Sequence, residues 1–138
     1  ARAIAERLVP GSSARFVPLL SDGGAATAGE KIRIAARWLQ ENCERPISIA
    51  DAAQVVAMSE RNFLRRFKLE LRMTPSDYLL QARLAITCSL LVDSELPVDK
   101  IARRSGMGNG DRLAKIFRKR MMVSPTEFRM QRRRALGG

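Results

Sequence analysis

The chain has 138 residues and carries 25 lysines and arginines against 14 acidic residues, so its formal net charge is +11 at pH 7. With 46% hydrophobic and 28% charged residues, the composition is that of a globular protein and not of a disordered tail. No apolar stretch approaches the roughly 20 residues of a membrane-spanning helix and no secretory signal is visible, so we expect a cytoplasmic protein without a membrane partner.

Residues 1–29 are predicted to be the end of an upstream domain followed by a flexible linker. Residues 1–8 have the pattern of a helix end, and residues 16–20 form a short apolar segment that contains a proline. Residues 21–29 are small and include several glycines, which is typical of a linker. We therefore place one further domain at residues 30–138.

The first half of that domain is predicted to contain a helix-turn-helix. Residues 30–42 keep the i, i+3, i+4, i+7 spacing of an amphipathic helix. A capping box at Ser48 begins a short helix that reaches about Ala57, and Ser59 can cap the next helix after a tight turn. Residues 75–94 then form a long helix, which begins with a proline at its first position.

The same pattern repeats in the second half at an offset of about 50 residues. Phe67 recurs as Phe117, and Pro75 recurs as Pro125. The repeat predicts a short helix, a turn, a second helix and a capped last helix, at residues 98–105, 106–109, 110–121 and from Pro125 onward. Strand signals are almost absent, so the sequence predicts an all-α fold.

The second helix of each pair carries a basic stripe. The two stripes consist of Arg61, Arg65, Lys68 and Arg72, and of Arg112, Lys115, Arg118 and Lys119. A single basic helical face is usually only a solvated face. Two such stripes on duplicated helix pairs favour double-stranded DNA as the partner. The low aromatic content of 5% argues against stacking on single strands or RNA.

Catalysis is not expected. The chain has no histidine, which removes the commonest general base and metal ligand. Cys43 and Cys88 are far apart and lie in helical patterns, which predicts reduced packing residues. No paired-carboxylate motif and no phosphate-binding glycine loop is present, so we predict no enzyme activity, no metal and no cofactor.

Several segments together carry a family resemblance. Residues 58–67, MSERNFLRRF, look like a first recognition helix, and Arg83-Leu84 with Leu90-Leu91 match a linker helix. Ile101-Ala102, Gly106, residues 117–119 and the segment 124–129, SPTEFR, match the signature around a second recognition helix. In these features residues 30–132 resemble the DNA-binding region of the AraC/XylS family of bacterial transcription regulators.

The resemblance implies seven helices, with two helix-turn-helix units joined by a long linker helix. It also implies sequence-specific binding of double-stranded DNA, activation of transcription and contact with RNA polymerase. The first ten residues look like the end of an amidotransferase-like sensor domain, which would mediate any dimerisation from upstream. A basic helical protein-interaction module without sequence-specific DNA binding is the alternative.

Site residues follow from the resemblance and from the chemistry of base edges. Arginine reads guanine, asparagine reads adenine, aspartate accepts from cytosine, and an apolar side chain meets the thymine methyl group. The predicted base-contacting residues are Arg61, Asn62, Leu64, Arg65, Asn109, Asp111, Arg112 and Lys115. The predicted phosphate-contacting residues are Ser59, Lys68, Arg72, Thr74, Arg118, Lys119 and Ser124. Core packing is the alternative for Leu64.

The sequence also departs from the family pattern at several positions. Arg72 and Met122 replace the glycine that usually stands three residues before each proline. Met107 and Leu113 replace aromatic residues that are common in the second motif. Asp111 is repelled by phosphate and could only accept from cytosine, and Gly110 loosens the start of that helix, so the sequence favours phosphate binding over base reading by the second unit.

Overall fold

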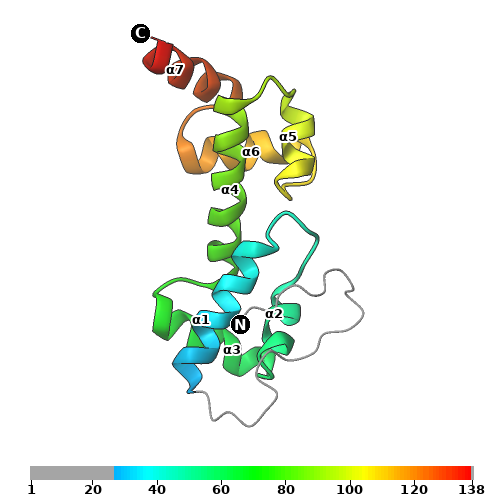
Figure 1. Cartoon of the computed structure of the whole chain (residues 1–138), viewed down its shortest axis with the longest axis vertical. Helices are drawn as coiled ribbons and strands as arrows, with labels where there is room; N and C mark the ends of the chain where they lie inside the picture. The colour runs from blue at the N-terminus through cyan, green and yellow to red at the C-terminus, as the bar shows by residue number, and fades with distance from the viewer. Residues whose placement is uncertain (1–26, 138) are drawn as a thin grey trace. The chain divides into compact units, whose positions relative to one another are not determined.

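A computed structural model describes residues 27–137, and over this range the chain forms helices and no β-strand (Figure 1). The helices are α1 (Ala28–Glu41), α2 (Ile49–Val55), α3 (Glu60–Leu71), α4 (Pro75–Asp93), α5 (Val98–Arg104), α6 (Gly110–Met121) and α7 (Pro125–Gly137). The predicted all-α class is confirmed for these residues, and no helix among them is long and apolar enough to cross a membrane. The predicted upstream domain end and most of the predicted linker, residues 1–26, lie outside the described part.

The described residues divide into two compact units. Unit 1 comprises residues 27–41 and Ile47–Tyr78, and unit 2 comprises Asn42–Pro46 and residues 79–137. The helix α4 is continuous from Pro75 to Asp93, so its first residues belong to unit 1 and the rest to unit 2. Each unit therefore contains one of the two predicted helix-turn-helix pairs.

Unit 1 is built around aromatic side chains of α3. Helix α1 packs against both α2 and α3, and Ile32 and Leu39 of α1 are fully buried. The rings of Phe63 and Phe67 lie 5.5 Å apart, and Phe67 also meets the ring of Tyr78 edge-on at 5.6 Å. These contacts fix which face of α3 is buried, because both phenylalanines are fully enclosed.

Helix α1 begins two residues earlier than predicted. The Thr27 amide donates to Glu30 Oε1 at 2.8 Å, and the Glu30 amide donates to Thr27 Oγ1 at 3.0 Å. This reciprocal capping box satisfies two amides that the first turn of a helix leaves without partners. Thr27, which the sequence analysis placed in the linker, therefore starts the helix.

The two tight turns have the same hydrogen bonding in both units. The amides of Met58 and Met107 each donate to the carbonyl five residues earlier, at 2.9 and 2.8 Å. The preceding residue has a positive φ in both turns, 56° at Ala57 and 83° at Gly106. Glycine is required at the second turn, because a Cβ on Gly106 would lie 2.5 Å from the Cys43 carbonyl oxygen.

Helices α3 and α6 also end alike, on left-handed residues that are not glycine. Arg72 has a φ of 63° and Met122 has a φ of 69°. Their amides donate to the carbonyls of Lys68 and Arg118, each at 2.9 Å. These are the two positions where glycine is expected in the family, because only glycine adopts this conformation without a steric penalty.

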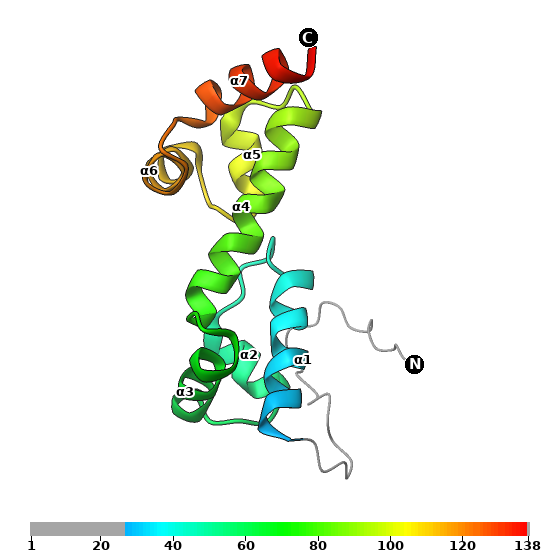
Figure 2. The same ribbon diagram turned by 90° about the vertical axis from the view of Figure 1, so that its left-hand side faces the viewer.

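Unit 2 has its own core, which the C-terminal part of α4 shares with α5 and α6. Leu84 and Leu91 of α4 are buried together with Ile101, Leu113 and Phe117. In Figure 2, α6 is seen nearly end-on beside this part of α4. Met107 and Leu113, the residues that replace family aromatics, are 3% and 0% exposed, so they serve as core residues here.

Two arginines hold the chain where helices end in unit 2. Arg83 donates through Nε to the Cys43 carbonyl at 2.6 Å and through Nη2 to the Arg45 carbonyl at 2.9 Å. Arg129 does the same at the end of α4, where it donates to the carbonyls of Leu91, Ser94 and Leu96 at 2.8, 3.1 and 2.7 Å. Both side chains thus satisfy carbonyls of the segments that follow α1 and α4, and Arg129 also satisfies one carbonyl in the last turn of α4.

Candidate nucleic-acid interface

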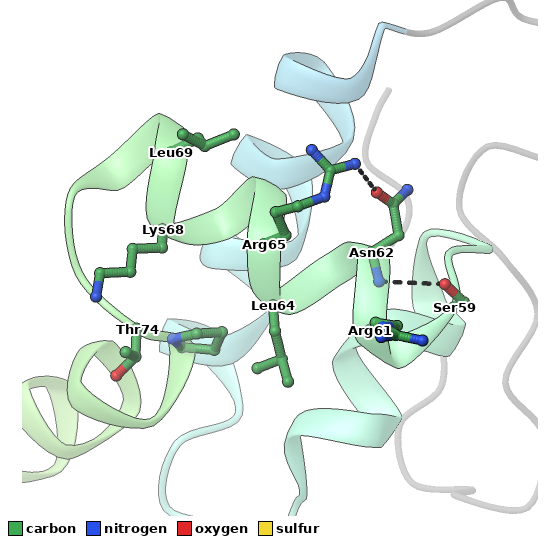
Figure 3. Close-up of a pocket in the computed structure, with 9 residues that line it drawn as sticks. Ser59, Arg61, Asn62, Leu64, Arg65, Lys68, Leu69 and Thr74 are labelled. Carbon is green, nitrogen blue, oxygen red and sulfur yellow. Dashed lines mark hydrogen bonds between the residues drawn. The ribbon is translucent and has the colours of Figure 1, made fainter.

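The face of α3 opposite its buried phenylalanines gathers polar and basic side chains (Figure 3). It forms an open depression of about 850 Å³, which is lined by Ser59, Arg61, Asn62, Leu64, Arg65, Lys68, Leu69, Thr74 and Pro75. The structure therefore brings together every predicted contact residue of the first unit except Arg72. We call this surface the α3 face.

The apolar members of the α3 face are exposed. Leu64 is 42% exposed, so the alternative that it packs in the core is wrong. Leu69, which sequence reasoning missed, also lines this depression and is 58% exposed. The signal for Leu69 was available, because it falls outside the i, i+4 spacing of the core residues Phe63 and Phe67.

Hydrogen bonds order the first turn of α3. Ser59 Oγ accepts from the Asn62 amide at 3.2 Å, which makes Ser59 the N-cap. Asn62 Oδ1 in turn accepts from Arg65 Nη2 at 2.7 Å, and Figure 3 shows the Arg65 guanidinium turned toward it. Arg66 is paired instead with Glu70, with Nη2 and Oε2 3.3 Å apart. The α3 face therefore carries the guanidinium groups of Arg61 and Arg65, which have no acidic partner among the described residues.

Arg72 does not line this depression but lies next to it. Its backbone forms the left-handed end of α3, and its side chain shares a second, smaller depression with Lys68 and Leu69. An exposed cation at the end of the helix is suited to phosphate and not to a base edge, since base-edge contacts come from the N-terminal part of a recognition helix.

Helix α6 repeats the arrangement in unit 2 with different side chains. Asn109 is its N-cap, and Asn109 Oδ1 accepts from the Arg112 amide at 2.8 Å. The Gly110 amide donates to Asp99 Oδ1 at 2.9 Å, which anchors the helix start to α5. The residues predicted to touch DNA from this helix are all exposed, namely Asp111, Arg112, Lys115, Arg118 and Lys119.

The remaining predicted phosphate contacts are helix caps. Thr74 Oγ1 accepts from the Asp77 amide at 3.1 Å at the start of α4. Ser124 Oγ accepts from the Glu127 amide at 3.1 Å, and the Ser124 amide donates to Glu127 Oε1 at 2.8 Å. The backbone and side-chain hydrogen bonds from Ser124, with a smaller contribution from Arg118, lower the pKa of the Glu127 carboxyl. Helix starts of this kind attract anions such as phosphate.

The two units differ strongly in charge. Among the described residues, unit 1 holds 8 basic and 6 acidic side chains, whereas unit 2 holds 14 basic and 6 acidic ones. Their net charges are therefore +2 and +8. Such an excess in unit 2 favours a polyanionic partner, because phosphate contacts release the counterions of the polyanion.

Other chemistry finds no support in the part of the chain that the structure describes. No group of three or more histidine, cysteine or acidic side chains could hold a metal ion there. Cys43 and Cys88 are free, as predicted, and burial raises the pKa of both thiols. They are therefore protonated packing residues at neutral pH.

Comparisons with known proteins agree with this geometry. A sequence profile of the helix-turn-helix domain matches residues 52–131. The HTH-type transcriptional regulator ArgR of Pseudomonas aeruginosa is 29% identical over 130 residues, which are 94% of this chain and 39% of the relative. The HTH-type transcriptional activator RhaS of an Enterobacter species is 32% identical over 95 residues, 69% of this chain and 34% of the relative. The chain thus spans little more than a third of these relatives.

Solved structures show the same fold. The DNA-binding domain of the transcriptional factor AdpA, determined in complex with a target DNA, matches with a TM-score of 0.72 and 27% identity over 76% of this chain and 95% of that one. A transcriptional regulator with an AraC-type DNA-binding domain from Chromobacterium violaceum matches with a TM-score of 0.68 and 31% identity, over 74% of this chain and 91% of that one.

Proposed function

Because the chain belongs to the AraC/XylS family of helix-turn-helix transcription regulators, we propose that α3 and α6 each enter the major groove of double-stranded DNA. Members of this family act by binding DNA and not by catalysis. The observation that carries the proposal is the α3 face, where cations, an amide and exposed leucines stand together on one capped helix.

The residue roles follow from position along each helix. In α3, Arg61 and Arg65 read guanine and Leu64 meets a thymine methyl group, while Lys68 and Arg72 bind phosphate. In α6, Arg112 and Lys115 face bases, Asp111 accepts from cytosine, and Arg118 and Lys119 bind phosphate. The caps Ser59, Thr74 and Ser124 place helix starts against the backbone of the duplex.

The side chain of Asn109 is held by a capping bond, which restricts the adenine contact predicted for it. Asn109 Oδ1 accepts from the backbone amide of Arg112, so the acceptor of the Asn109 side chain is engaged in capping α6. An adenine contact needs both the acceptor and the donor of an asparagine amide. We therefore assign Asn109 first to capping, with its Nδ2 group left to donate to DNA.

At the level of the full-length protein, we propose a transcription activator that acts in the bacterial cytoplasm and contacts RNA polymerase. The support for activation is the described activity of the RhaS relative. Dimerisation is assigned to a domain upstream of residue 30, and the sensor resemblance in residues 1–10 lies outside the described residues.

Selection of bound sequences from random duplexes tests the DNA proposal. We expect a defined motif, and titration of that motif should give an affinity that falls steeply as salt increases. A chain that enriches no sequence and shows no salt dependence would be a protein-interaction module instead. Both measurements use the 138-residue chain itself.

A further inference from the structure

The hydrogen bond between Asn62 and Arg65 fixes the orientation of an arginine on the α3 face. The two residues are one turn apart on the same side of α3, and Arg65 Nη2 lies 2.7 Å from Asn62 Oδ1. Arg61 and Lys68, the residues one turn to either side of Arg65, are cations and offer no acceptor. Asn62 is thus the neighbour, one turn away, that accepts from the guanidinium and holds it in place.

We propose that Asn62 is a positioning residue that orients the Arg65 guanidinium for one base, rather than a reader of a base of its own. The proposal rests on the proposed function, in which Arg65 faces a base edge. A free arginine side chain samples many rotamers and loses that freedom when it binds. A neighbour that holds the guanidinium in the base-contacting orientation before DNA binds reduces the conformational entropy lost at the correct base. Random DNA, which offers no matching base, gains nothing from this orientation.

The chemistry of both side chains fits this division of roles. One N–H of the guanidinium is used on Asn62, and the four that remain suffice for a bidentate contact with guanine O6 and N7. Asn62 would have to turn its Oδ1 and Nδ2 toward adenine to read it, whereas one lone pair of Oδ1 already accepts from a charged donor and holds the amide toward Arg65. The backbone N–H of Asn62 donates to Ser59 Oγ, and this bond fixes the backbone that carries Asn62.

Unit 2 provides an internal comparison. At the same offset of 50 residues, Asn62 corresponds to Arg112 and Arg65 corresponds to Lys115. Both side chains are cations, so Lys115 cannot receive the same support from its neighbour. The proposal therefore predicts that the preference at the Arg65 base is sharper than the preference at the Lys115 base.

Sequence selection with the 138-residue chain tests the proposal in five forms: wild type, Asn62→Ala, Asn62→Asp, Arg65→Ala and the double variant Asn62→Ala/Arg65→Ala. We expect Asn62→Ala to lower discrimination by about 3- to 10-fold at the same base that Arg65→Ala affects. Asn62→Asp keeps an acceptor for the guanidinium and should retain that preference while binding all DNA more weakly. In the Arg65→Ala background, Asn62→Ala should add less than about 2-fold.

Gln54→Ala is the matched control, because it removes an exposed amide from α2 without a change in charge. Melting curves verify that each variant is folded. Asn62 reads its own base, and the proposal is overturned, if Asn62→Ala relaxes a different position and its effect adds to that of Arg65→Ala. An unchanged motif for Asn62→Ala overturns it as well. A wild-type chain that selects no motif would instead overturn the proposed function, which is a separate result.

Discussion

Arg65 is the residue on which sequence reading by unit 1 is expected to depend most. Its replacement by alanine should weaken binding to the preferred site by about 1–3 kcal/mol and relax the preference at one position, since that is the range of a bidentate base contact. Competition titration against random duplex measures both effects, with the exposed Arg33→Ala on α1 as the charge-matched control. Equal losses on specific and random DNA would identify Arg65 as a phosphate contact.

Met122 is a residue whose native conformation is costly. It is 79% exposed and left-handed, so the substitution Met122→Gly loses little packing and removes a steric penalty. We expect the free energy of unfolding to rise by about 1 kcal/mol. The neighbouring Met121→Gly, at the last residue of α6, should instead lower it, because Met121 is still helical and glycine is a poor helix residue. Urea unfolding of both variants gives the comparison, and a destabilised Met122→Gly would contradict the argument.

At the residue scale the sequence indicated which side chains face inward but not how the exposed ones pair. The spacing of Phe63 and Phe67 predicted the core, and it left the neighbouring basic residues outside. The pairing of Arg65 with Asn62 could not be predicted, because an arginine one turn from several partners has many rotamers of similar energy. The left-handed backbone of Ala57 could not be predicted either, since alanine gives no signal for it.

At the scale of elements, prolines, turns and capping signals together predicted the helix starts closely. The predicted starts at Pro75, Val98 and Gly110 are those of α4, α5 and α6. The roles of Arg83 and Arg129 were not predictable in the same way. Their acceptor carbonyls lie 40 and 38 residues away in the chain, and a local pattern shows only a basic residue in a helix.

Arg129 is expected to stabilise the junction after α4. Arg129→Met keeps the apolar length of the side chain but leaves the carbonyls of Leu91 and Leu96 without their charged donor, while the Ser94 carbonyl still accepts from Arg133 Nη2 at 2.6 Å. We expect a loss of about 2–3 kcal/mol in the free energy of unfolding, because such hydrogen bonds involve a charged group and unpaired carbonyls are costly. Arg134→Met, at an exposed position of the same helix, should change it by less than about 0.5 kcal/mol. Similar losses in the two variants would show that the carbonyl contacts contribute nothing.

The start of α7 is expected to depend on pH. The pKa of Glu127 is lower in the folded chain than in the unfolded one, so its carboxylate stabilises the fold above the unfolded pKa of about 4.3. That contribution is lost as the pH falls through the folded pKa. Glu127→Gln should therefore differ from wild type at neutral pH and converge with it under acid conditions. Amide exchange near Ser124, measured across this pH range, reports the effect, and a difference that grows on acidification would contradict it.

At the scale of the whole molecule, the salt dependence of binding should come mainly from unit 2. Replacing Arg118 and Lys119 by glutamine should flatten the slope of log affinity against log salt by up to about 2 units, since each phosphate contact contributes nearly one. The control removes two exposed charges from α1, Arg33 and Arg37, and should leave the slope unchanged. Equal changes in both variants would mean that only net charge matters.

From the proposed DNA contacts, we expect the unequal charges of the units to govern how long the protein stays at each position along a chromosome. Phosphate contacts carry no sequence information, and they allow a protein to slide and hop between sites. With a net charge of +8, unit 2 is expected to retain the chain on random duplex during this search. Unit 1, with a net charge of +2, is expected to dissociate quickly from any sequence that does not fit the proposed contacts of Arg65 and Leu64. We therefore expect added salt to shorten the distance scanned along the duplex more than it lowers the preference for the correct site.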